Sequence, residues 1–170
     1  KDFNTLEYAH HNKVSIEMAA RDLRYSWFEK LTKELNAQVI AVAHHVNDQI
    51  ETFFLNMLRG SGIRGYKGML PAFGKIVRPF LNTPRAEIED YINKYQIPYR
   101  DDHSNRDTTI LRNAIRHKVI PELEQINQSF VDTMSKNMQR LIGVWSFLKL
   151  HFNEMEERMI EQSREITKIK

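Results

Sequence analysis

The chain has 170 residues, of which 41% are hydrophobic and 28% are charged, as in ordinary globular proteins with one core and room for an appendage. It contains no cysteine, which excludes disulfides, thiolate catalysis and cysteine-ligated metal clusters. No run approaches the roughly 20 apolar residues of a membrane span, and no signal-peptide pattern opens the chain, so we expect a cytoplasmic protein without a membrane partner.

Basic residues are unevenly distributed, although the formal net charge is only +3. Residues 52–86 contain no Asp or Glu, and the end of the chain is rich in Glu. The cations of the acid-free stretch are Arg59, Arg64, Lys67, Lys75, Arg78 and Arg85. This asymmetry predicts a local surface for a polyanion, and the alternative is a solvated loop without a binding role.

The first predicted elements are two helices with a strand between them. Residues 1–13 have the character of a loop, and apolar residues then recur every three or four positions over 15–35, which predicts a helix with Ser15 as its N-cap. The apolar run 'QVIAVA' at 38–43 predicts a buried parallel strand. A second helix is expected to follow and to end at Gly60.

The next predicted elements are a loop, a strand and more helices. Five of the six glycines fall in 60–74, which predicts a long loop, and 75–80 predicts a second short strand. Thr83 as N-cap and Pro84 at the first helical position predict a helix start. Two short helical pieces are expected on either side of Pro121.

A long helix is predicted after residue 127. Its apolar side chains alternate steps of four and three, which favours packing in a helical hairpin or bundle. They are Met134, Met138, Leu141, Trp145, Leu148, Phe152, Met155 and Met159. The order of elements before this helix favours an α/β fold with a parallel sheet, so we predict a core domain over 1–127 and a helical domain over 128–170.

The strand-to-helix junction 'HHVNDQIET' is the first candidate site. Ligands of open α/β sheets bind at the carboxyl ends of strands, beside helix N-termini. Asp48 and Glu51 can share one helical face there and hold Mg²⁺ on a nucleotide phosphate or a cationic substrate. The alternative is that Asp48 only interacts favourably with the helix dipole and that Glu51 is solvated. A zinc site with both His44 and His45 is disfavoured, because consecutive strand residues point to opposite faces.

Two basic motifs are the other candidates. The glycines of 'RGSGIRGYKG' allow close approach of the backbone to a phosphate, and its cations Arg59, Arg64 and Lys67 attract one. It lacks the Gly-Lys-Ser/Thr ending of a Walker loop, and a flexible connector remains open. In 'LRNAIRHK', Arg112 and Arg116 are four residues apart, with Asn113 alongside, which suits a phosphate clamp or a plain basic helix.

The motifs together resemble those of one family. In chain order they are 'SIEMAARDLRYSWF', 'AHHVNDQIET', 'LRGSGIRGYKGM', 'VRPFLNTPRAEI', 'DDHSN' and 'LRNAIRHKVIPEL'. Over most of residues 15–127 the chain closely resembles the tRNA(Ile)-lysidine synthetase family of the PP-loop ATP pyrophosphatase group. The resemblance implies a partial Rossmann-like parallel-sheet core of the adenine nucleotide alpha-hydrolase type, followed by the long helix of an all-helical linker domain.

The resemblance also implies a reaction. This family uses ATP to adenylate cytidine 34 of an isoleucine tRNA with a CAU anticodon, and the ε-amine of L-lysine then displaces AMP. The implied catalytic residues are Asp48, which is also a possible Mg²⁺ ligand, Arg112 and Arg116. The implied substrate or ATP contacts are His45, Glu51 and Asn113. The implied tRNA contacts are Arg21, Arg24, Arg59, Arg64, Lys67 and Arg78.

The chain departs from the family pattern in two places. The Ser-Gly-Gly-x-Asp-Ser loop that holds the pyrophosphate of ATP is absent from it, and so is most of the C-terminal tRNA-binding domain. We therefore expect an internal segment without lysidine-forming activity of its own, and a homodimer is a candidate assembly of its parent. The alternatives are a non-catalytic RNA-binding module, and a PP-loop tRNA cytidine thiolation enzyme, which the lack of cysteine disfavours. The sequence assigns no role to His10 or His11.

Overall fold

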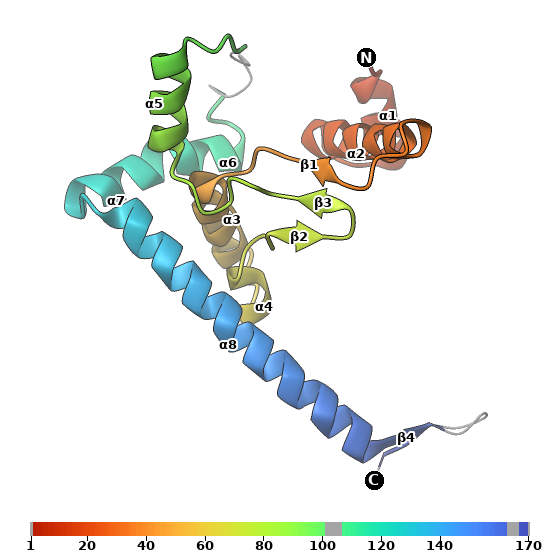
Figure 1. Ribbon diagram of the computed structural model, residues 1–170. Coiled ribbons are helices and arrows are strands. Elements are labelled where there is room, and N and C mark those ends of the chain that lie inside the picture. Colours follow the sequence, from red (N-terminus) through yellow and green to blue (C-terminus); the bar gives the residue numbers. More distant parts are fainter. Residues whose placement is uncertain (1, 101–106, 163–166, 170) are drawn as a thin grey trace. The chain divides into compact units, whose positions relative to one another are not determined.

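The computed structural model describes residues 2–100, 107–162 and 167–169 (Figure 1). The chain divides into two compact units, one of residues 1–42 and 72–78, the other of residues 43–71 and 79–170. The 'DDHSN' motif lies outside the described residues. Within the described ranges, no helix combines the length and the hydropathy that a membrane span requires.

The first unit is built from two helices and a small sheet. Its elements are α1 (Thr5–Asn12), α2 (Ile16–Glu34), β1 (Ile40–Ala41), β2 (Ala72–Phe73) and β3 (Ile76–Val77). The expectation of a loop over residues 1–13 is wrong. The Asn4 side chain accepts the Glu7 N–H (3.2 Å) and so caps α1, which ends where Lys13 takes a left-handed conformation.

Helix α2 confirms its predicted start. The Ser15 Oγ accepts the Met18 N–H at 3.2 Å, so Ser15 is the N-cap. Helix α2 packs against α1, Ala19 of α2 is fully buried, and Phe3 meets Trp27 edge-on with ring centroids 6.3 Å apart. The amphipathic spacing of α2 thus serves the contact between the two helices.

The sheet has the strand order β1-β3-β2 and is mixed. The predicted parallel pairing is confirmed for β1 and β3, with Ile40 opposite Ile76, whereas β2 is antiparallel to β3. The strands are shorter than predicted. Backbone bonds from Ile40 N–H to Lys75 O (2.8 Å) and from Val42 N–H to Val77 O (3.0 Å) mark the extent of the parallel ladder. A wholly parallel sheet was therefore not found, because 'AF' folds back on β3 through the turn at Gly74, whose φ is +58°.

The second unit is helical except for one short strand pair. Its elements are α3 (Val46–Leu58), α4 (Ile63–Tyr66), α5 (Arg85–Tyr95), α6 (Leu111–Ala114), the π-helical segment η2 (Ile115–Val119), α7 (Ile120–Ile126), α8 (Phe130–Met159), β4 (Ile160–Gln162) and β5 (Thr167–Ile169). Helix α3 ends before Gly60, as predicted, and Gly60 has a φ of +74°.

The glycine-rich stretch 60–74 is more ordered than a loop prediction allows. It contains α4 and β2, and its backbone turns on itself through a bond from Gly65 N–H to Gly62 O (2.8 Å). The Asn56 side chain donates to Gly65 O at 2.8 Å and ties this turn to α3. A tertiary contact rather than local propensity thus stabilises the short helix.

The start of α5 differs from the prediction. Pro84 occupies the N-cap, and the Thr83 carbonyl instead accepts the Val46 N–H at 3.1 Å. The first helical N–H, that of Arg85, donates to the Asn47 Oδ1 of α3 at 3.0 Å. The capping oxygen therefore comes from another helix, which a local pattern cannot reveal.

The helical pieces around Pro121 form a continuous run, contrary to the predicted break. The turn before the proline widens into η2, where the Ile120 N–H donates to Ile115 O, five residues back. Pro121 has no N–H, and its ring excludes the carbonyl four residues earlier from the α-helical position. We attribute the widened turn to this local conflict.

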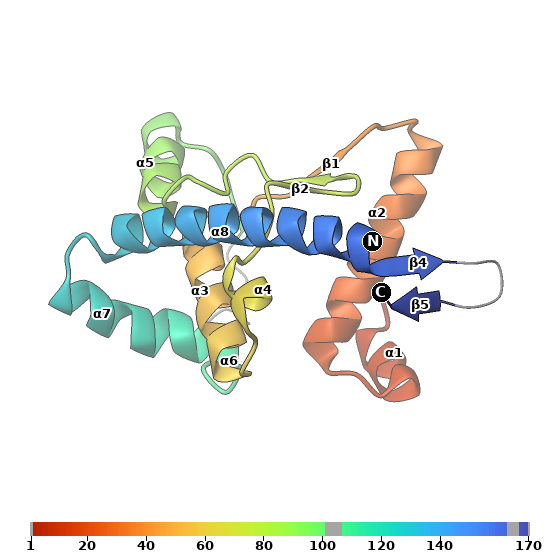
Figure 2. The ribbon, with the colours of Figure 1, turned by 90° about the horizontal axis from the view of Figure 1, so that it is seen from below.

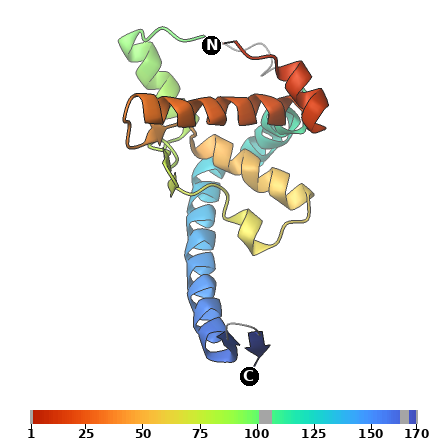
Figure 3. The ribbon, with the colours of Figure 1, turned by 90° about the vertical axis from the view of Figure 1, so that its right-hand side faces the viewer.

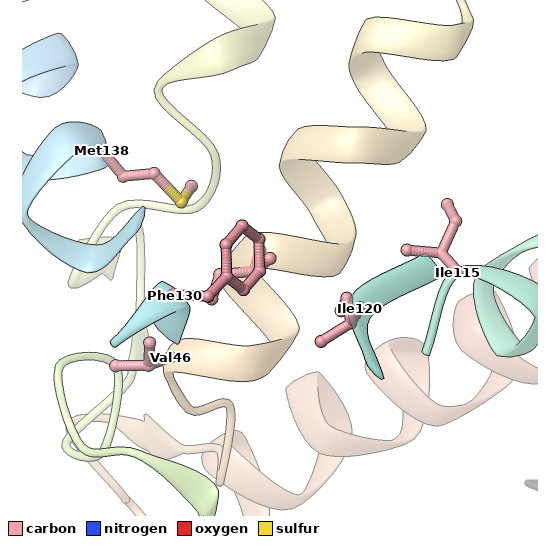
Figure 4. Packing of buried hydrophobic residues seen from close by; sticks show 6 residues of the cluster. Val46, Ile115, Ile120, Phe130 and Met138 are labelled. Carbon is pink, nitrogen blue, oxygen red and sulfur yellow. The ribbon is translucent and has the colours of Figure 1, made fainter. Parts of the chain in front are cut away.

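Helix α8 confirms the predicted long helix, and its first half closes the core of the second unit. Buried side chains from α3, η2, α7 and α8 meet there (Figure 4). They are Val46, Ile50, Ile115, Ile120, Phe130 and Met138. Helix α8 contacts α3 and α4 along this half (Figure 2).

The second half of α8 extends past α4 toward β4 and β5 (Figure 3). Several of its large apolar side chains are exposed: Val144, Phe147, Leu150, Phe152, Met155 and Met159. Packing of this half in a hairpin or bundle, and a domain boundary near residue 128, stay predictions.

Candidate functional site

The N-terminus of α3 is built by a reciprocal pair of side chains. His45 is its N-cap, and its Nδ1 accepts the Asp48 N–H at 3.4 Å. In return the Asp48 Oδ2 accepts the His45 N–H at 3.0 Å. This capping box fixes the Asp48 carboxylate at the helix end, where the helix dipole favours negative charge.

Two arginines from one helical run meet the acids of α3. Arg112, in α6, donates from Nε to Glu51 Oε2 (2.6 Å) and from Nη2 to Asp48 Oδ1 (3.0 Å). Arg116, in η2, donates from Nε to Glu51 Oε1 (2.6 Å) and from Nη2 to Glu51 Oε2 (3.0 Å). Its Nη2 also lies 3.6 Å from Asp48 Oδ1. The four residues form one ion-pair cluster, joining segments that are more than 60 positions apart in sequence.

Burial makes this cluster different from a surface ion pair. Glu51 is only 1% exposed, yet both its oxygens accept from guanidinium groups. Burial lowers the pKa of Arg116, but the hydrogen bond and charge of Glu51, with the charge of Asp48, outweigh it and raise that pKa overall. Two negative and two positive groups therefore balance inside a shielded region.

The π-helical segment holds one member of this cluster. Arg116 lies within η2, and Arg112 lies one turn earlier in α6, so both guanidiniums converge on Glu51. Segments of this kind occur often at functional sites. The widened turn thus gives Arg116 the position from which it reaches a carboxylate on another helix.

His45 is held neutral by its surroundings. Burial lowers its pKa below the ordinary value of 6.5, against the raising effect of Asp48 and Glu51, and Arg85 and Arg116 lower it further. A neutral ring agrees with its role as an acceptor at the helix cap. His44 precedes it and is half-buried.

The cluster does not have the donor set of a metal site. The carboxylates of Asp48 and Glu51 are already neutralised by two guanidiniums, and no group of three His, Asp or Glu side chains suited to a metal occurs in the described part of the chain. Asp48 as a Mg²⁺ ligand stays a prediction.

Asn113 follows Arg112 of the cluster in the sequence, and its side chain has a structural role. It is buried, and its Nδ2 donates to Asp107 O at 2.9 Å, which fixes the segment that enters α6. Asp107 in turn accepts from the Thr109 N–H and hydroxyl (2.9 and 2.6 Å), and these bonds lower its pKa. Contact of Asn113 with substrate or ATP stays a prediction.

The predicted tRNA contacts fall into distinct environments. In the first unit, Arg21 and Arg24 are exposed on α2 and flank the Tyr25 ring, at 4.9 and 5.8 Å from its centroid. Arg78 is also in this unit but is only 8% exposed, which does not favour a surface phosphate contact.

In the second unit, Arg59 and Arg64 are exposed, whereas Lys67 is half-buried with its Nζ 5.0 Å from the Trp145 ring centroid. The exposed arginines thus have the accessibility that a nucleic-acid contact requires, whereas the Lys67 ammonium already makes a cation–π contact.

The sequence did not single out the residues that hold the basic loop, residues 59–68, and the following Met69 to α3. The Gln49 side chain donates to Met69 O (2.7 Å) and accepts the Met69 N–H (2.6 Å), and Asn56 binds Gly65 O. Gln49 and Asn56 are seven residues apart, so they lie on one face of the helix. Two amide side chains seven residues apart in the helix were the available signal.

Comparison with known proteins identifies the class. The sequence model of the PP-loop domain family matches residues 2–123, so the chain belongs to the PP-loop domain family, which implies an ATP-binding domain.

The individual relatives are more specific. The tRNA(Ile)-lysidine synthase of Porphyromonas gingivalis is 46% identical over 147 residues, covering 86% of this chain and 32% of that protein. The tRNA(Ile)-lysidine synthase of Bacteroides thetaiotaomicron is 41% identical over 159 residues (94% and 37%). That of Thermosipho africanus is 40% identical over 153 residues (90% and 36%). The chain spans about a third of the length of these curated relatives.

Proposed function

We propose that this chain is part of an enzyme that joins lysine to an isoleucine tRNA to form lysidine. The observation that carries the proposal is the similarity to tRNA(Ile)-lysidine synthases, at 46% identity across 86% of the chain. We assign it the adenine nucleotide alpha-hydrolase fold, with the core over 1–127 and a helical linker over 128–170. The partners are ATP, L-lysine and the CAU-anticodon tRNA(Ile), in the cytoplasm, with Mg²⁺ and a homodimer as further proposals.

The reaction proceeds in two transfers. The C2 carbonyl oxygen of cytidine 34 attacks the α-phosphorus of ATP, and pyrophosphate leaves. The ε-amine of lysine, which reacts in its neutral form, then attacks C2, AMP leaves with the former carbonyl oxygen, and the attacking nitrogen loses one proton to water. ATP supplies the activating group, and this chain's residues bind and orient the reactants.

The ion-pair cluster supports this assignment because it offers both kinds of charge at one helix end. Asp48 and Glu51 suit the ammonium of lysine, and His45 and Asn113 border them. Arg112 and Arg116 suit the phosphate of an adenylate, since preorganised cations stabilise charge that develops during transfer. The ammonium of lysine would replace one guanidinium beside a carboxylate. The cluster can therefore bind lysine while each buried carboxylate keeps a counter-charge.

The test is AMP release by the full-length protein, measured with and without lysine and with matching or non-matching tRNA. Lysidine formation predicts release that requires all three substrates. We expect Asp48→Ala to abolish turnover while its circular dichroism spectrum stays unchanged. Asp132→Ala removes an exposed acid of α8 that pairs with Lys136 four residues on, and it serves as the control.

A non-catalytic RNA-binding module gives the opposite result. It predicts tRNA binding that falls steeply with salt and does not respond to ATP or lysine. The exposed arginines of the basic loop agree with either function, so the lysine dependence of AMP release decides between them. Near-normal turnover in Asp48→Ala would remove Asp48 from the site.

A further inference from the structure

Lys67 and Trp145 join the basic loop to the long helix. Lys67 follows α4 directly, and Trp145 lies midway along α8, within the same unit. The ammonium stands 5.0 Å from the centroid of the indole ring, and both side chains are half-buried. At this distance the face of an indole ring attracts a cation.

The rest of the loop is fastened to α3. Gln49 makes both of its amide bonds to the backbone of Met69, and Asn56 donates to Gly65 O. The Ser61 Oγ donates to Asn56 O at 2.6 Å. The contact between Lys67 and Trp145 adds an attachment to a second helix, so the loop is fixed from two directions.

The cations of this loop differ in what surrounds them. Arg59 and Arg64 are exposed, while the Lys67 ammonium is already engaged by an aromatic ring. A phosphate would have to draw Lys67 away from Trp145, whereas the two arginines need no such rearrangement. Fixing a loop in its binding conformation lowers the entropy cost of association.

We propose that Lys67 is a positioning residue whose contact with Trp145 holds the loop of residues 59–68 for tRNA binding, and that the phosphates are met by Arg59 and Arg64. This assignment rests on the proposed function, and it replaces direct tRNA contact by Lys67. Trp145 thereby gains a role in tRNA affinity without touching the tRNA.

The test is the affinity of the full-length protein for tRNA(Ile), measured over a range of salt concentrations. We expect Lys67→Met and Trp145→Ala each to weaken binding about two- to fivefold, the size of a single cation–π contact. The double variant should be no weaker than either single one, and the slope of log affinity against log salt should stay unchanged. Trp145→Phe should weaken binding less than Trp145→Ala, since it keeps a ring.

The controls come from two other places in the chain. Lys94→Met removes a cation beside the Tyr95 ring of α5 (5.4 Å), a pair of the same kind away from the loop. Phe147→Ala removes an exposed aromatic side chain of α8 that contacts His151 instead of the loop. Neither should change tRNA affinity.

Direct phosphate contact gives a different pattern. Lys67→Met would then lower the salt slope by about one, and Trp145→Ala would leave affinity unchanged. That result, or independent effects that add in the double variant, would overturn the proposal.

A structural readout separates this proposal from the proposed function. The ring current of Trp145 should shift the Lys67 side-chain protons upfield in the NMR spectrum of the free protein, and Trp145→Ala should remove the shift. An absent shift would refute the contact whether or not the protein modifies tRNA. A present shift in a protein that binds no tRNA would uphold the contact and refute the role in binding.

Discussion

Glu51 is the residue of the candidate site whose burial costs most, because its carboxylate is charged and almost fully removed from water. Each of its oxygens accepts from an arginine Nε at 2.6 Å, so the cost of removing it from water is offset by two guanidiniums. Such a group is stable only while its partners stay in place, which couples α3 to α6 and η2.

Glu51→Gln should lower the free energy of unfolding by about 3 kcal/mol or more, since it removes one of the two buried counter-charges of Arg112 and Arg116 and leaves only Asp48 to balance both. Urea denaturation monitored by circular dichroism measures this. Glu89→Gln breaks an exposed pair with Arg85 (2.7 Å) and should cost under about 1 kcal/mol. Equal losses in the two variants would contradict a buried, coupled role for Glu51.

His45 gives the protein a predictable dependence on pH. Burial lowers its folded-state pKa below 6.5, so the unfolded chain binds more protons as the pH falls through about 6.5. The stability that neutral His45 contributes is therefore fully present above about pH 6.5. It decreases as the pH falls from there to the folded-state pKa. His45→Asn keeps a capping side chain and should flatten this decline.

The measurement for His45 is the urea midpoint between pH 5 and pH 7. The control is His151→Asn, which replaces an exposed histidine beside Glu154. If wild type and His45→Asn lose stability in parallel as the pH falls, His45 is not the group responsible.

At the scale of elements, α3 organises the second unit through separate faces. Its apolar face enters the core with Val46 and Ile50, Asp48 and Glu51 meet the arginines, and Gln49 with Asn56 holds the basic loop. The chain conformation of that loop is also constrained by a glycine.

Gly68 should not tolerate a side chain. Its φ is +67°, and a Cβ there would collide with Gln49 Oε1 and lie 2.8 Å from Met138 Cε. Gly68→Ala should therefore cost about 1–3 kcal/mol in the free energy of unfolding. Gly62→Ala, at a position with a negative φ and no atom within 4 Å, should change it by under about 0.5 kcal/mol. Thermal or urea denaturation of both variants tests the difference.

At the scale of the whole molecule, the acid-free stretch separates into structural and accessible cations. Arg78 is buried and Lys67 is held by Trp145, which leaves Arg59 and Arg64 exposed in the basic loop. On the proposed function, these two arginines account for the phosphate contacts of the loop.

Arg59→Gln and Arg64→Gln should each weaken tRNA binding and lower its salt slope by about one, because each removes one phosphate contact. The measurement is tRNA affinity between low and physiological salt. Lys136→Gln on α8, where Lys136 pairs with Asp132 at 2.6 Å, is the control. An unchanged slope in both arginine variants would exclude this loop as the phosphate contact.

Much of this organisation was predictable from the sequence. The α2 cap at Ser15, the parallel β1–β3 pair, the end of α3 before Gly60 and the long α8 follow from local rules of capping, burial and periodicity. The ordered motifs also predicted the PP-loop family.

The tertiary structure decided what depends on partners distant in sequence. The N-cap of α5 comes from Asn47, α1 formed where a loop was expected, and the stretch 60–74 is ordered by Gln49 and Asn56. The four charges of the cluster were each identified from the sequence, but their pairing was not. A buried charge is stable only beside its counter-charge, and folding brings Glu51 to arginines more than 60 residues away.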